Sequence, residues 1–227
     1  MKLRNIKTFE PLTPKVTNLL RNAIINGDIK PGERLNETLI SGKLGISRSP
    51  IREAFKILES ENLVETYGRR GTFVKDLSIK EIDEIYTVIK LINLAATRLA
   101  ASHMNEARKK ELVSIMKKVE RIVGTHDIDK VKPLSTELHT FIMKASENSL
   151  LLKIHNNLRI QQERFRIKGT SYGATEITDI VNEHIAILKA LLNGDANEAE
   201  LLMANHVDNA RSRVLNALRK NNDINLM

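Results

Sequence analysis

The fold of the first third of the chain is decided by residues 36–75, NETLISGKLGISRSPIREAFKILESENLVETYGRRGTFVK. Within this stretch, Ile51, Ala54, Phe55 and Leu58 recur at the i, i+3, i+4, i+7 spacing of one buried helical face. The spacing predicts a helix over 49–61, with Ser49 as its N-cap and Pro50 at its first position. A shorter helix is expected over 36–43, with Leu39, Ile40 and Leu44 facing inward, and Gly45 ends it.

The segments on either side complete a small domain. Upstream, residues 12–26 carry apolar side chains at helical spacing, namely Val16, Leu19, Leu20, Ala23 and Ile24. Downstream, residues 63–67 and 72–75 are β-prone runs joined by Gly68-Arg69-Arg70-Gly71, which predicts a hairpin with a basic tip. Two short helices followed by such a hairpin indicate a winged helix-turn-helix.

The remainder of the chain is expected to be helical. Helices are predicted over 78–103, 106–124, 128–146, 149–168, 175–193 and 196–220. The predicted fold is therefore mainly α: a winged helix-turn-helix domain over 1–76 and an all-α helical bundle over 77–227.

Composition and charge limit the possible functions. The chain has 227 residues and no cysteine, which excludes disulfides and thiolate chemistry. It lacks both an apolar run near the roughly 20 residues of a membrane span and the apolar core of a signal peptide. We therefore expect a cytoplasmic protein without a membrane partner. The net charge is +8, and residues 1–76 hold 14 Lys and Arg against 9 Asp and Glu, a net of +5. A basic N-terminal module suits DNA, although a protein that is merely basic would show the same balance.

The N-terminal end of the predicted reading helix carries the side chains that suit DNA. The second helix of such a unit enters the major groove through this end, which here holds Ser47, Arg48, Ser49 and Arg52. Arginine can form two hydrogen bonds with guanine, and short hydroxyl groups suit phosphates. Arg69 and Arg70 could reach the minor groove or the backbone. Structural alternatives are an ion pair of Arg52 with Glu53 or Glu59 and a solvated turn at Arg69 and Arg70.

Residues 24–74 closely resemble the GntR family of bacterial regulators. The resemblance lies in PGERLNE, SRSPIREAF, LESENLV and RRGTFV, in the family's order and spacing. It implies that Arg48 and Arg52 read bases, that Ser47 and Ser49 supply hydroxyl contacts, and that Gly71 is the wing glycine. Asn62 stands where the family usually has glycine, a position with left-handed φ to which asparagine is suited. Thr38 replaces a contacting arginine of some members, so a contact there is doubtful.

The second domain resembles the all-helical FCD effector domain of the FadR-like GntR subgroup. The resemblance lies in STELHTFIMKASEN, EHIAILKALLNGDANEA and MANH, which contain His139, His184 and His206. It implies that these histidines bind one divalent metal, zinc or nickel by their donor type, and that the metal orients a carboxylate effector. Ser135 replaces the usual aspartate ligand, so the site is either weak or completed by a ligand.

The effector itself is only loosely indicated. Many relatives have an R-x-x-L-E motif, whereas this chain has Ile89 and Asn93 at its charged positions, with Lys90 shifted by one residue. Candidate effector-binding residues are Lys90, Asn93 and Ser135. The other histidines are interpreted as surface or satisfied residues: His103, His126 and His155.

The sequence leaves three functional classes to consider: an enzyme, an effector-responsive regulator and an effector-independent DNA-binding protein. A histidine-lined bundle could host metal-assisted hydrolysis, but no carboxylate accompanies the three histidines at a motif position and no other catalytic motif is present. The sequence therefore predicts no enzyme. It predicts a homodimeric regulator, either a repressor or an activator, that binds a palindromic operator in double-stranded DNA and responds to a small-molecule effector. The alternative is an effector-independent DNA-binding protein whose helical domain only dimerises.

Overall fold

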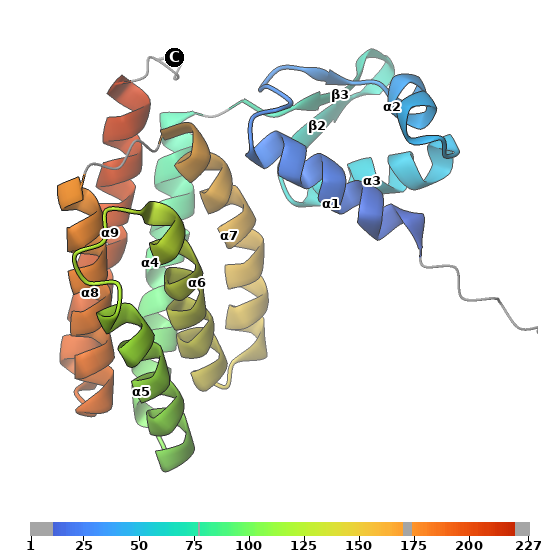
Figure 1. The fold of residues 1–227 in the computed structure, drawn as a ribbon. Coiled ribbons are helices and arrows are strands. Elements are labelled where there is room, and N and C mark those ends of the chain that lie inside the picture. Colours follow the sequence, from blue (N-terminus) through green and yellow to red (C-terminus); the bar gives the residue numbers. More distant parts are fainter. Residues whose placement is uncertain (1–10, 77, 170–173, 221–227) are drawn as a thin grey trace, which may run out of the picture. The chain divides into compact units, whose positions relative to one another are not determined.

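The fold is described from a computed structural model, for residues 11–76, 78–169 and 174–220. The described residues up to 76 form one compact unit and those from 78 onward form a second (Figure 1). The mainly helical architecture expected from the sequence is confirmed.

The first unit packs three helices with a small antiparallel sheet. Its elements in chain order are α1 (Leu12–Ile25), β1 (Arg34–Leu35), α2 (Glu37–Leu44), α3 (Arg48–Ser60), β2 (Val64–Tyr67) and β3 (Gly71–Val74). The sheet order is β1-β3-β2, with Arg34 opposite Phe73 and Val64 opposite Val74. Strand β1 is too short for its pattern to be visible in the sequence, and only its pairing with β3 reveals it.

The buried face of α3 is the one that the sequence predicts. Ile51, Ala54 and Leu58 have no exposed surface, and Phe55 is buried beside them. Asn62, just after the helix, adopts a φ of 58°, the left-handed conformation expected for a residue in a glycine position. Local chemistry therefore fixes both the packing of α3 and the turn that leads into the wing.

Three details of the first unit differ from the sequence expectations. The N-cap of α3 is Ser47 rather than Ser49. Leu19 is 52% exposed and Leu39 is 58% exposed, and no residue of α2 is buried. Within the described residues the short α2 packs mainly on α3, which leaves Leu39 largely exposed on its outer side.

The second unit is a bundle of long helices. They are α4 (Ile79–Ser102), α5 (Glu106–Glu120), α6 (Ile128–Ala145), α7 (Ser149–Gly169), α8 (Ala174–Leu192) and α9 (Ala196–Lys220). Each of α4, α5 and α6 begins at a side-chain cap, provided by Ser78, Asn105 and Asp127. Among the described residues no helix is long and apolar enough to cross a membrane.

Helix α4 packs extensively against α9. Among the described residues three ion pairs join these helices: Lys90 with Asp208, Arg98 with Glu200 and Arg211 with Asp83. Helices α8 and α9 form an antiparallel pair that turns at Gly194, whose φ is 74°. Side chains from α4, α6, α7, α8 and α9 can therefore meet inside one bundle, and the predicted histidine site lies there.

Candidate functional site

The DNA-reading residues predicted from the sequence are all accessible. Ser47, Arg48, Ser49 and Arg52 are exposed at the start of α3. Arg52 donates from Nε to Oε2 of Glu37 on α2 at 2.8 Å, rather than pairing with Glu53 or Glu59. This bond uses Nε–H, one of the five N–H donors of the guanidinium.

The wing tip is a short 3-10 turn, Gly68–Arg70, followed by Gly71. Arg69 and Arg70 are both exposed. Gly71 has a φ of 103°, and a Cβ at this position would lie 2.9 Å from Nε of Arg34. The left-handed backbone and this close approach explain why glycine suits the position.

His139, His184 and His206 come together in the core of the second unit. They lie on α6, α8 and α9, and one potential ligand atom from each lies within 4.8 Å of the other two. The ring of His206 is 5.3 Å from that of His139 and 4.8 Å from that of His184, measured between centroids. His184 and His206 are buried and His139 is half-buried.

Hydrogen bonds fix the orientation of two of the three rings. Nδ1 of His139 lies 3.1 Å from Oδ1 of Asn93, whose Nδ2 donates to the carbonyl of Ile89. Nδ1 of His206 lies 2.7 Å from a carboxylate oxygen of Glu183. Both partners are acceptors, so each Nδ1 carries the proton and donates it. In the neutral imidazoles the lone pairs are then on the Nε2 atoms, which face each other at 3.2 Å.

Two facing lone pairs repel each other unless a cation lies between them. A proton shared by the two imidazoles or a metal ion bound by both would remove this repulsion. The third imidazole, that of His184, is close enough to join a metal but not needed for a shared proton. Three histidines, two of which bond through Nδ1 to outer partners, are a typical donor set for a transition metal, so the residues present fit such an ion.

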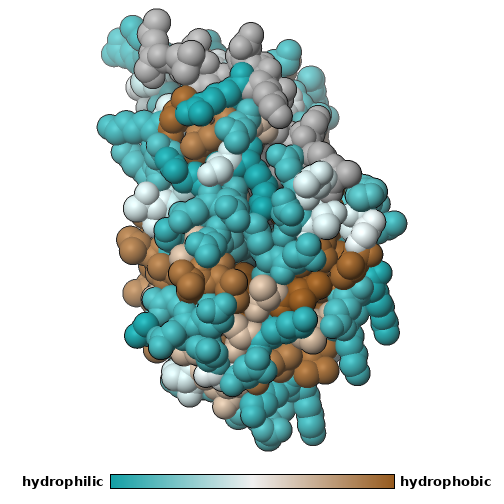
Figure 2. Space-filling model, turned by 90° about the vertical axis from the view of Figure 1, so that its left-hand side faces the viewer, coloured by the Kyte–Doolittle hydropathy of each residue, from teal (hydrophilic) through white to brown (hydrophobic). Residues whose placement is uncertain are grey.

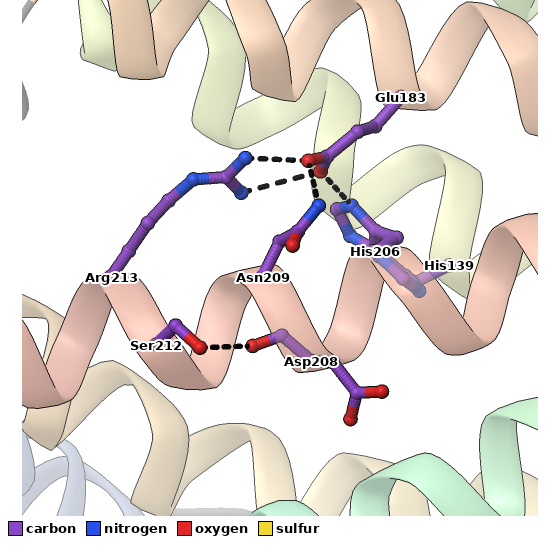
Figure 3. A network of polar contacts seen from close by, with 7 residues as sticks. All are labelled: His139, Glu183, His206, Asp208, Asn209, Ser212 and Arg213. Atoms are coloured by element: carbon purple, nitrogen blue, oxygen red, sulfur yellow. Dashed lines mark hydrogen bonds and ion pairs between the residues drawn. The ribbon is translucent and has the colours of Figure 1, made fainter.

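Glu183 is the centre of a polar network between α8 and α9 (Figure 3). Besides His206, it accepts hydrogen bonds from Asn209 at 2.8 Å and from Arg213 at 2.5 Å. Burial alone would raise the pKa of Glu183, but the hydrogen bonds from His206, Arg213 and Asn209 outweigh it and lower the pKa to about 2. Glu183 is therefore a carboxylate that holds His206 in place. We call His139, His184 and His206 the triad.

A small polar cavity adjoins the triad. The centres of water-sized molecules can occupy about 40 Å³ of it. An adjoining hollow, with about 40 Å³ by the same measure, shares Ser135, His139 and His206 with it. Of the three predicted effector-binding residues, Asn93 and Ser135 line the cavity. Lys90 does not line it and instead pairs with Asp208 at 2.6 Å.

His155 is not the surface or satisfied residue that the sequence suggested. It is 7% exposed, and its Nε2 has no hydrogen-bond partner among the described residues. The ring lines the cavity and stacks with that of His139 at a centroid distance of 6.3 Å. Burial and the charge of Arg159 lower the pKa of His155 to about 4. The sequence suggested otherwise because no family motif marks this position.

Of the other two histidines, one follows the expectation and the other does not. His126 is exposed. His103 is half-buried, and its Nδ1 lacks a hydrogen-bond partner within the part of the chain that the structure describes. It lies at the C-cap of α4, so it does not belong to the triad.

Glu183 is the residue that the sequence interpretation missed most clearly, although it directly precedes His184 in the motif EHIAILKALLNGDANEA. Glu183 precedes Gly194 by 11 residues and His206 follows it by 12. In an antiparallel helix pair, residues at equal distance from the turn lie side by side. The signal was thus present in the spacing across the turn.

Comparisons with known proteins agree with both units. Residues 12–74 match the family described as "Bacterial regulatory proteins, gntR family", and residues 84–209 match the FCD domain. The gluconate operon transcriptional repressor of Bacillus subtilis is 30% identical over 80% of this chain and 76% of its own length. The uncharacterized HTH-type transcriptional regulator YdhC of Bacillus subtilis is 35% identical over 58% of this chain, but this alignment spans only 59% of that relative.

A solved structure shows the same fold. The E. coli protein McbR/YncC matches 93% of this chain and 99% of its own, with a TM-score of 0.72 and 20% sequence identity. The matching families and relatives are transcriptional regulators and not enzymes.

Proposed function

Because the chain belongs to the GntR family of transcriptional regulators, with an FCD domain, we propose that its operator affinity is controlled by a small carboxylate bound beside a metal ion at His139, His184 and His206. The observation that best supports a metal ion is that the Nε2 atoms of His139 and His206 face each other at 3.2 Å. Imidazole donors favour zinc or nickel over magnesium or calcium.

The surroundings of the triad support a site that an effector completes. Ser135 lies one helical turn before His139 and lines the cavity, but its hydroxyl is a poorer metal ligand than the aspartate that the family resemblance implies. Three neutral imidazoles leave a bound divalent ion with its full charge and with coordination positions to fill. A carboxylate entering the cavity would supply the missing negative donor.

A metal titration tests this site. Protein stripped with a chelator and then given Zn²⁺ or Ni²⁺ should retain one ion per chain and melt at a higher temperature. His184→Ala should abolish both effects, while His126→Ala, a change at an exposed histidine outside the triad, should leave them intact. If neither metal is retained, a proton shared by His139 and His206 explains the geometry and the metal proposal is wrong.

We further propose that the first unit, residues 1–76, binds DNA and that the second, residues 77–227, dimerises. The exposed start of α3 and the basic wing tip support the first assignment. Exposed apolar residues on α4 and α9 support the second, since Val88 is 41%, Leu91 62% and Leu201 57% exposed. Figure 2 shows apolar patches interrupting a hydrophilic surface on one side of the molecule.

A two-fold dimer would present two reading helices to a palindromic operator. Selection of DNA sequences by the full-length protein should therefore return two inverted half-sites about one helical turn apart, or a multiple of it. Adding zinc together with a small carboxylate should change the affinity for the selected operator. An unchanged affinity would instead favour a helical domain that only dimerises.

A further inference from the structure

Helix α7 forms a polar wall of the cavity next to the triad. His155, Arg159 and Gln162 follow one another at the i, i+4, i+7 spacing of one helical face, and all three line the cavity. His139 and His206 line the same cavity from α6 and α9. Any molecule that binds at the triad therefore lies within reach of α7.

His155 stands out in this wall because its hydrogen-bonding capacity is unused. Its side chain is buried, and Nε2 has no partner among the described residues. A buried polar atom without a partner costs free energy, so such atoms in folded proteins call for an explanation. A leucine would fill the same space without this cost. The position thus favours binding over stability.

The charges of the wall are balanced. Arg159 is ion-paired with Glu163 one turn further along α7, and Glu163 also lines the cavity. Gln162 lies 3.5 Å from the hydroxyl of Tyr86, to which its amide donates. A second carboxylate of a ligand would meet a guanidinium that is already neutralised and would be repelled by Glu163. An uncharged group that both donates and accepts hydrogen bonds suits the wall better.

We propose that His155, with Arg159 and Gln162, forms a second subsite that binds a hydroxyl group of the molecule whose carboxylate binds at the triad. The ligand class is then a small hydroxy acid, since the cavity is small. The inference rests on the proposed carboxylate-binding function and adds the chemistry of the other end of the ligand. His155 is the residue of the subsite that sets specificity.

The test compares acids that differ by one group. Calorimetry on the zinc-loaded full-length protein would measure binding of butyrate, 3-hydroxybutyrate, 4-hydroxybutyrate and succinate. At least one hydroxybutyrate should bind roughly 3- to 10-fold more tightly than butyrate, as expected for one net hydrogen bond. Succinate should bind no more tightly than butyrate.

Two substitutions assign the preference to His155. His155→Leu should bring the hydroxybutyrate affinity down to that of butyrate while the butyrate affinity changes less than about twofold. His155→Gln should keep part of the preference, because an amide can also bond to a hydroxyl. Without ligand, the leucine variant should melt at or above the temperature of the parent. A markedly lower melting temperature would show that His155 has a structural role and overturn the inference.

The remaining outcomes separate this inference from the proposed function. Binding of butyrate without any preference for a hydroxyl group, or tighter binding of succinate, overturns the subsite alone. A preference that survives in His155→Leu overturns the role of His155. If none of the four acids binds the zinc-loaded protein, the proposed carboxylate site is wrong, and the proposed hydroxyl subsite is wrong as well.

Discussion

Replacing Glu183 by glutamine tests how the triad is held in place. Glu183 accepts hydrogen bonds from His206, Asn209 and Arg213, with donor–acceptor distances between 2.5 and 3.2 Å. Glutamine has almost the same shape but only one acceptor oxygen. Its amide group must face at least one of these donors, and the charge of Arg213 loses its partner.

The size of the effect follows from burial. The side chain of Glu183 is 17% exposed and that of Arg213 is 11% exposed. Removing one partner of a fully buried ion pair costs about 3–5 kcal/mol. Partial exposure and the remaining acceptor reduce this, so we expect a loss of about 2–4 kcal/mol in the free energy of unfolding. For a unit of this size each kcal/mol lowers Tm by roughly 2–4 °C.

Glu137→Gln is a matched control that separates the effect of burial from the effect of losing a charge. Glu137 pairs with Lys118 at 2.5 Å, but the two side chains are 38% and 45% exposed. Glu137→Gln removes the same charge and should cost only about 0–1 kcal/mol. Thermal and urea unfolding of the metal-free proteins at neutral pH would measure both variants. If Glu183→Gln is no more destabilising than Glu137→Gln, the network does not support the fold in the way the geometry suggests.

The same variant should also weaken the metal site. A carboxylate that holds the outer nitrogen of a metal-binding histidine orients the ring and makes it a better donor. Loss of such a partner typically lowers metal affinity by about 10- to 100-fold. A zinc titration of Glu183→Gln with an unchanged dissociation constant would contradict the role of Glu183 as an orienting residue.

Three other sets of variants test the remaining assignments. Arg48→Ala and Arg52→Ala should each cost roughly 1–3 kcal/mol in operator binding. Arg70→Ala should instead weaken binding to all DNA sequences alike and make the affinity less dependent on salt concentration. Parental affinity in both helix variants would disprove the reading helix. Residues 77–227 alone should sediment as a dimer, and residues 1–76 alone as a monomer that binds DNA weakly. The reverse result would assign dimerisation to the first unit. Ser135→Asp should increase the rise in Tm caused by zinc, because it adds an anionic donor beside His139, and an unchanged rise would place Ser135 outside the metal site.

The sequence predicted best where local chemistry determines the structure. The buried stripe of α3 follows from helical spacing alone, and the left-handed φ of Asn62 follows from its place in a glycine position. Leu39 fits the same kind of pattern yet is 58% exposed. Periodicity shows which side chains share a face, but it does not show whether another element covers that face.

The candidate site was predictable only as far as its residues lie in motifs. His139, His184 and His206 were found through family resemblance, and the structure places them together. His155 stands in KIHNNLR, a segment whose polarity suggests a surface. Its burial depends on where α4, α6 and α9 pack around α7, which is a tertiary property that the local sequence does not encode.

Helix α4 links the proposed effector site to the first unit along the chain. The wing strand β3 ends at Val74, and α4 begins at Ile79 after a short link. The same helix carries Asn93, which accepts the hydrogen bond of His139, and Ile89, which lines the cavity. A ligand that shifts the ring of His139 would therefore act on the helix that follows the wing in the chain. It can change DNA affinity only if it binds the alternative placements of α4 with different affinity. Asn93 contacts the triad directly, so we expect such a difference to arise through its hydrogen bond with His139.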